Sequence, residues 1–100
     1  MYGTVAHVRP KQGQEKAVVS ILEEWNANRR PKVKGAVAGY LYKLDKSPSE
    51  FIMTVVFQDK KTYVSNAEDP EQDKWFRKLR ELLQADPVWE DGEIVGHWSY

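Results

Sequence analysis

The chain contains no cysteine and only two histidines among its 100 residues. It therefore has no disulfide, no thiolate metal ligand and no cysteine nucleophile. Neither sign of charge is in excess, because 15 Lys and Arg balance 15 Asp and Glu, and this argues against the basic surface that nucleic-acid binding needs. No apolar run approaches the roughly 20 residues of a membrane span, and no signal peptide is recognisable at the start. We expect a cytoplasmic protein with no nucleic-acid or membrane partner.

Other sequence patterns are also missing, and their absence disfavours several kinds of functional site. The six glycines are scattered singly, so no glycine-rich phosphate loop exists and nucleotide cofactors are disfavoured. The two histidines lie far apart without carboxylates at ligand spacing, so no metal site is predicted. Adjacent acidic residues at 23–24, 68–69 and 90–91 fall in polar segments, which is not the setting of a catalytic carboxylate pair.

The hydrophobic share of 41% is ordinary for a globular protein, and the length allows one domain, residues 1–100. In the first strand, Val5 and His7 share one face, whereas Thr4, Ala6 and Val8 share the other. Strands are predicted at 2–9, 33–44, 51–57 and 93–100, and helices from Gly13 to Pro31, at 60–66 and at 70–85.

Two helix starts carry capping signals. Asp59 can cap the short helix at 60–66. Asp69 stands at an N-cap with Pro70 as the first helical residue and Gln72 at the third, which predicts a reciprocal capping box. Glycines inside the strand at 33–44 are typical of a bulge or of a close approach by another element.

The order β-α-β-β-α-β, with the second helix in two pieces, predicts an α+β ferredoxin-like antiparallel sheet with its helices on one face. The strand at 51–57 reads Phe-Ile-Met-Thr-Val-Val-Phe and has almost no polar face. Such a strand is buried on both sides, yet the chain's own helices cover only one face of the sheet. We therefore expect a homodimer in which a second copy covers the other face.

Three stretches resemble the antibiotic biosynthesis monooxygenase family: Val-Arg-Pro-Lys-Gln-Gly at 8–13, the strand and short helix at 50–63, and Asn-Ala-Glu-Asp-Pro-Glu-Gln-Asp-Lys-Trp-Phe at 66–76. The resemblance covers essentially the whole chain and is strongest to uncharacterised bacterial members. It implies a dimeric α/β barrel with a ligand cavity between the helices and the sheet of each subunit. Members of this fold include cofactor-free oxygenases of polyketide quinols, haem-degrading monooxygenases and lactone isomerases.

The resemblance implies cofactor-independent oxygenation of an aromatic or polycyclic phenol. Such chemistry needs a base, a group that holds an oxyanion and an apolar wall that excludes water. The predicted catalytic residues are His7, Asn66 and Trp75. The predicted substrate-binding residues are Tyr63, Phe76, Arg30, Tyr42 and His97, with His97 as a second candidate base.

Alternatives stay open at this point. The fold can serve as a non-catalytic module that binds a small apolar or aromatic molecule, and Trp75 and Phe76 then only pack in the core. Haem binding would need His7 or His97 as an unusual iron ligand, because the helix at 75–85 contains no histidine. The basic cluster at 29–34 complements a helix C-terminus, or it binds a substrate carboxylate through Arg30.

Overall fold

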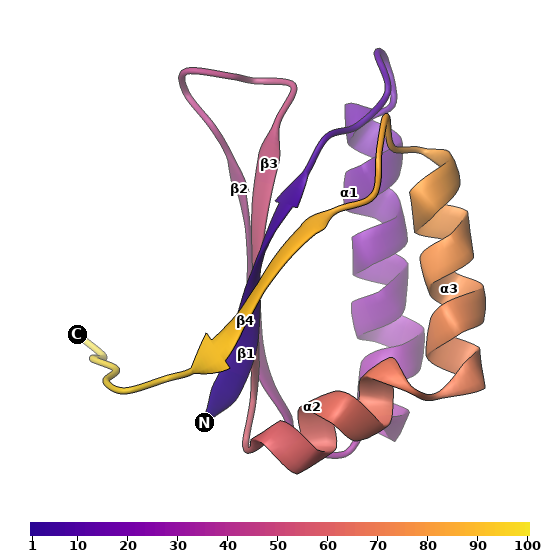
Figure 1. Ribbon diagram of the computed structural model, residues 1–100. Coiled ribbons are helices and arrows are strands. Elements are labelled where there is room, and N and C mark those ends of the chain that lie inside the picture. The colour runs from indigo at the N-terminus through magenta and orange to yellow at the C-terminus, as the bar shows by residue number, and fades with distance from the viewer.

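The computed structural model describes residues 1–100 and places three helices on one side of a four-stranded antiparallel sheet (Figure 1). The strands are β1 (Tyr2–Val8), β2 (Ala36–Lys43), β3 (Phe51–Phe57) and β4 (Val88–Glu93). The helices are α1 (Glu15–Glu24), α2 (Lys60–Ala67) and α3 (Pro70–Glu81). The strand order β2-β3-β1-β4 confirms the predicted ferredoxin-like α+β fold. No helix combines the length and hydropathy of a membrane-spanning segment.

Strand alternation divides the sheet into a face that the helices cover and an open face. Ala6 and Val8 of β1 are buried beneath the helices, together with Phe51 and Met53 of β3. From the helix side, the core is completed by Val18, Trp75, Leu79 and Leu83. The hydrophobic core therefore lies entirely on the helix side of the sheet.

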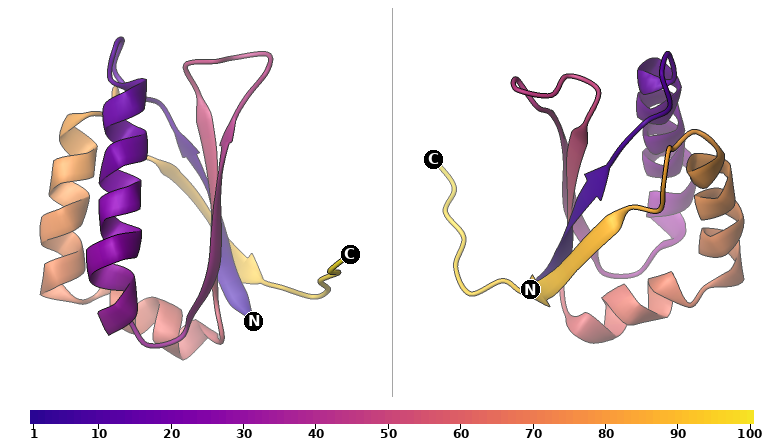
Figure 2. Two further views of the ribbon diagram at one scale, coloured as in Figure 1. Left: turned by 180° about the vertical axis from the view of Figure 1, so that it is seen from behind. Right: turned by 45° about the horizontal axis from the view of Figure 1, so that its top comes forward.

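The open face carries the other set of side chains, and no helix lies over it in either view of Figure 2. Val5 of β1, Tyr40 of β2 and Val88 of β4 are 40%, 62% and 61% exposed. The intervening residues of β3, Ile52 and Val56, are half-buried. The chain thus leaves an apolar sheet surface in contact with solvent.

Helix α1 does not end as a regular helix. It continues into a π-helical turn, η1 (Trp25–Arg29), and a 3-10 turn, η2 (Arg30–Lys32). The Arg30 N–H donates to the Trp25 carbonyl five residues earlier, whereas an α-helix joins residues four apart. The extra residue in this turn brings residue 30, rather than residue 29, above Trp25.

Both predicted N-caps are present, but the capping box is not. The Asp59 carboxylate accepts the Thr62 N–H at 2.8 Å, and the Asp69 carboxylate accepts the Glu71 N–H at 2.9 Å. The side chain of Gln72 does not return to the backbone of Asp69. Its Oε1 accepts instead from the indole Nε1 of Trp25 at 2.7 Å, a partner from a distant part of the chain.

The glycine signals in the second strand mark a bulge and a close approach. The register of β2 against β3 shifts between Ala36 and Ala38. Gly35 has φ +87°, and a Cβ at this position would lie 2.5 Å from the Thr62 Oγ1 of α2. The register shift is an irregularity within the strand, whereas Gly35, just before β2, lies close to α2.

The last strand is β4 at Val88–Glu93, so its prediction at 93–100 is wrong. Gly92 pairs with Gly3 and Asp91 with Thr4, so the Asp-Gly pair lies inside the strand rather than in a turn. Every residue of β4 is exposed, as the edge position and acidic composition allow. Residues 94–100 have no regular structure and extend away from the sheet (Figure 1).

Candidate ligand cavity

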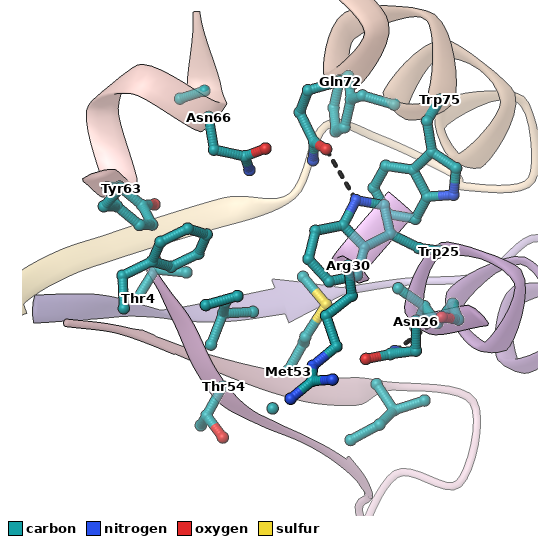
Figure 3. Close-up of a pocket in the computed structure, with 18 of the residues that line it drawn as sticks. Thr4, Trp25, Asn26, Arg30, Met53, Thr54, Tyr63, Asn66, Gln72 and Trp75 are labelled. Carbon is teal, nitrogen blue, oxygen red and sulfur yellow. Dashed lines mark hydrogen bonds between the residues drawn. The ribbon is translucent and has the colours of Figure 1, made fainter. Parts of the chain in front are cut away.

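A cavity of about 640 Å³ lies between the helices and the covered face of the sheet. Its lining comes from α1, the η1 and η2 turns, α2, α3 and all four strands, and 15 of its 25 residues are hydrophobic. Figure 3 shows side chains converging on it from the helices above and the sheet below. This size and composition are those of sites that hold a small organic molecule.

Two indoles form a rigid wall of the cavity. The rings of Trp25 and Trp75 are 6.2 Å apart at 57°. Hydrogen bonds fix each ring, since Trp25 Nε1 donates to Gln72 Oε1 and Trp75 Nε1 donates to the Ile21 carbonyl at 3.2 Å. The wall is therefore in place before any ligand enters, which favours binding of a flat apolar molecule.

A polar cluster lies at another part of the lining, where the buried Thr4, the half-buried Tyr63 and the exposed Asp91 meet. The Tyr63 hydroxyl donates to Asp91 Oδ1 at 2.8 Å. Burial, followed by Asp91, raises the pKa of Tyr63 to about 12, while the nearby Thr4 hydroxyl acts in the opposite direction. Thr4 is 5% exposed, and its Oγ1 has no hydrogen bond of good geometry. A buried hydroxyl without a partner is costly, and a ligand oxygen would satisfy it.

Asn66 presents its amide to the cavity. Its Oδ1 accepts from the Arg29 guanidinium at 3.1 Å, and Arg29 in turn lies 3.6 Å from the Asp69 carboxylate. With the oxygen occupied, the amide nitrogen is left to donate, and Figure 3 shows the amide pointing into the cavity. Arg29 thus orients Asn66 as a hydrogen-bond donor towards a ligand.

Arg30 adds a positive charge to the lining. It is exposed, and its guanidinium makes no hydrogen bond or ion pair within the protein. Of the acidic residues that share the lining, Asp91 is bonded to Tyr63, and Asp73 lies 3.0 Å from Arg77. Glu23 lines the cavity without such a partner.

Five of the eight site residues predicted from sequence line this cavity together. They are Asn66, Trp75, Tyr63, Phe76 and Arg30. They come from α2, α3 and the end of the first helix, so the fold assembles them from separate elements.

The other three, His7, Tyr42 and His97, do not reach the cavity. His7 and Tyr42 both pair with Ile52 and share its open face, because alternate residues of a strand point to opposite sides. His7 Nε2 lies 2.8 Å from Glu90 Oε2 on that face. His97 lies in the exposed segment after β4.

Sequence reasoning missed Thr4, Asp91 and Gln72 as lining residues. Thr4 offered a signal, since it is the one hydroxyl on a strand face otherwise formed by Ala6 and Val8. Asp91 was assigned to a turn, and Gln72 to a cap. Neither a turn residue nor a capping residue predicts a contact with residues more than 25 positions away in the chain.

The lining does not fit a haem group. No histidine borders the cavity, and the Tyr63 hydroxyl is already bonded to Asp91. The structure also contains no cluster of three or more His, Asp or Glu side chains that could hold a metal ion.

Of the comparisons with known proteins, only the comparison with solved structures finds matches. No family model matches the sequence, and no curated protein matches it. Among solved structures, an antibiotic biosynthesis monooxygenase superposes with a TM-score of 0.76 at 14% identity, covering 96% of this chain and 100% of that one. A protein from Chloroflexus aurantiacus assigned to the same group gives 0.79 at 20% identity, covering 98% and 96%. The chain has the fold of the antibiotic biosynthesis monooxygenases.

The same fold also occurs in a protein for which no activity is named. A protein of unknown function from Nitrosomonas europaea gives a TM-score of 0.79 at 19% identity, covering 99% of this chain and 93% of that one. At such identities the likeness establishes the monooxygenase fold and leaves the reaction to be argued from the cavity.

Proposed function

We propose that this protein binds a small aromatic phenol in the cavity and oxygenates it with dioxygen, without a cofactor. The observation that carries the proposal is a rigid indole wall combined with a buried, unpartnered Thr4 hydroxyl beside Tyr63. An aromatic ring fits the wall, and a phenol oxygen fits the polar group. The monooxygenases with the same fold support the reaction class by analogy.

The polar residues suggest a path for the phenol proton. Because the Tyr63 O–H is donated to Asp91, the Tyr63 oxygen is free to accept the O–H of a substrate. The substrate proton passes to Tyr63 as the Tyr63 proton passes to Asp91. Thr4 and the Asn66 amide then donate to the phenolate oxygen. Trp75 forms part of the apolar wall of the site.

The phenolate supplies the electrons of the reaction. Dioxygen forms a C–O bond with a ring carbon ortho or para to the phenol oxygen. Loss of the hydrogen on that carbon and cleavage of the O–O bond then release water and leave a quinone. Dioxygen takes up four electrons, all of them from the substrate, so no external reductant is required. A site for this step needs an apolar wall and hydrogen-bond donors for an oxyanion, and the indole wall and the Thr4 and Asn66 side chains could supply them.

Oxygen uptake with a panel of naphthols and quinols tests the proposal. We expect uptake above the spontaneous rate, and a fall of roughly 10²-fold or more in Asp91→Asn, the size typical of a general base. Glu90→Gln is the matched control, because Glu90 is the neighbouring carboxylate but lies on the open face. Equal rates in Asp91→Asn and Glu90→Gln would contradict the relay.

A second candidate is a binding module without catalysis. The observation in its favour is that neither histidine borders the cavity, so the base most common in enzymes near neutral pH is absent from the lining. Saturable binding of a naphthol without oxygen uptake, for every substrate in the panel, would favour this candidate over the oxygenase.

We also propose that two copies of the chain pack through their open sheet faces. Val5, Tyr40, Tyr42 and Val88 give this face an apolar surface in a subunit whose helices lie wholly on the other side. A stable dimer buries about 800 Å² per partner, which a four-stranded sheet face can supply. His7 and Glu90 would then meet the partner as a hydrogen-bonded pair.

A further inference from the structure

We propose that the ligand of this cavity is an aromatic carboxylate and that Arg30 binds its carboxylate group. The inference rests on the proposed aromatic-binding function and adds the charge of the ligand and its direction in the site. It assigns a specific task to a residue that would otherwise only neutralise a helix end.

The first argument is the unused guanidinium. Arg29, Arg77 and Arg80 each pair with an acidic side chain, at 3.6, 3.0 and 2.6 Å, and Arg9, which is unpaired, does not border the cavity. Arg30 has no partner, although it borders a mostly apolar cavity. Figure 3 shows its side chain extending from the end of the first helix towards β3 rather than away from the cavity. A planar guanidinium binds a carboxylate through two parallel hydrogen bonds.

The second argument is the backbone that positions it. Wound as an α-helix, the chain would put Arg29 one turn beyond Trp25 on the cavity side, and Arg30 would be rotated by about 100°. The π-helical turn instead puts Arg30 in that place, through its hydrogen bond to the Trp25 carbonyl. Arg29 no longer occupies that place, and its guanidinium donates to Asn66 Oδ1 instead. Such turns often occur at functional sites.

The third argument is the separation of the polar groups. Tyr63 and Thr4 lie together at one part of the cavity, and Arg30 approaches from the end of the first helix with the indole wall beside it (Figure 3). A rigid aromatic ring system with a hydroxyl at one end and a carboxylate at the other matches this arrangement. Glu23 also borders the cavity and disfavours a second negative group.

Two naphthalene probes that differ in one group test the inference. Both 6-hydroxy-2-naphthoate and 2-naphthol carry the phenol, and only the first carries a carboxylate. Titration calorimetry at pH 7 with the whole chain should show the naphthoate binding about tenfold more tightly, the scale of one charge-assisted contact at a partly solvated site. Arg30→Ala should abolish this preference while leaving 2-naphthol affinity within about twofold.

Control variants separate the site from general charge. Lys32→Ala removes the same charge from the same basic cluster but does not border the cavity, so the tenfold preference should persist. Arg30→Lys should retain part of it, because an ammonium keeps the charge and loses the two-bond geometry. Circular dichroism establishes that each variant is folded.

The outcomes distinguish this inference from the proposed function. Equal affinity for the two probes in the wild type, or a preference that survives Arg30→Ala, would overturn the carboxylate assignment and leave aromatic binding intact. Failure of both probes to bind would count against the aromatic-binding proposal and this inference together.

Discussion

Trp75 connects the stability of the fold to the shape of the cavity, and its truncation should separate the two contributions of its side chain. The indole is 9% exposed, belongs to the core cluster and donates one hydrogen bond to the Ile21 carbonyl. Trp75→Ala removes the buried ring system and leaves a void that adds to the existing cavity. We expect a loss of about 3–5 kcal/mol in the free energy of unfolding.

Trp75→Phe should cost much less, about 1–2 kcal/mol. An aromatic ring remains against Trp25, and the lost hydrogen bond is worth about 1 kcal/mol. The Ile21 carbonyl is not left without a donor, since it also accepts from the backbone N–H of Trp25. Urea unfolding followed by circular dichroism, at one protein concentration for all variants, gives both values by linear extrapolation.

Trp89→Phe is the control, because this indole is 43% exposed on the edge strand and donates no hydrogen bond within the protein. Its change should stay within about 0.5 kcal/mol. A loss below about 1 kcal/mol in Trp75→Ala would refute the assignment of Trp75 to the core. A loss in Trp75→Phe equal to that in Trp75→Ala would refute the division into ring packing and one hydrogen bond.

Four further outcomes follow from single features of the structure. Light scattering should give twice 11.6 kDa for the wild type and 11.6 kDa for Val5→Glu, whereas Val64→Glu on α2 should leave the dimer intact. Gly3→Ala should prevent folding, seen as loss of the circular dichroism signal, because its Cβ would lie 2.0 Å from the Val55 carbonyl oxygen across the β1–β3 pair. Tyr63 should ionise near its pKa of about 12 in an ultraviolet titration, above the ordinary tyrosine pKa of 10.0. The interactions that raise the pKa of Tyr63 stabilise the fold in full below pH 10, and this stabilisation is lost as the pH rises from 10 to 12. Tyr63→Phe should remove this pH dependence. The hydrogen bond from the Thr62 backbone N–H lowers the pKa of Asp59. The stability that this carboxylate contributes is therefore present above pH 3.8 and is lost as the pH falls further. Asp59→Asn should flatten this part of the thermal stability profile.

Local pattern was sufficient for most of the fold. The strand at 51–57 and the helix start at Asp69-Pro70 lie where their hydrophobic spacing and capping residues predict. The edge strand was predicted too late in the chain, because residues Glu90 to Glu93 have the composition of a turn. Pairing with β1 overrides that composition, and only the partner strand specifies it.

The candidate site was harder to predict because it depends on which face of a strand meets the helices. Residues 4, 6 and 8 and residues 5 and 7 form two faces in the sequence, and both contain apolar side chains. Nothing local says which set the helices cover, so His7 was assigned to the cavity and Thr4 was not. The aromatic residues of α3 were easier, because an amphipathic helix has only one apolar side to present.

The π-helical turn at Trp25–Arg29 has a consequence for how this chain tolerates changes in length. The turn holds one residue more than an α-helical turn, so deletion of the exposed Ala27 would let the backbone close an ordinary turn with Arg30 still one turn beyond Trp25. Helix α1 holds no extra residue around Ser20, so deletion of Ser20 cannot be absorbed in this way. It would rotate the preceding part of the helix by about 100° relative to Trp25 and turn Val18 out of the core. The π-helical turn is therefore a place where a one-residue deletion can occur without moving the charge that borders the cavity.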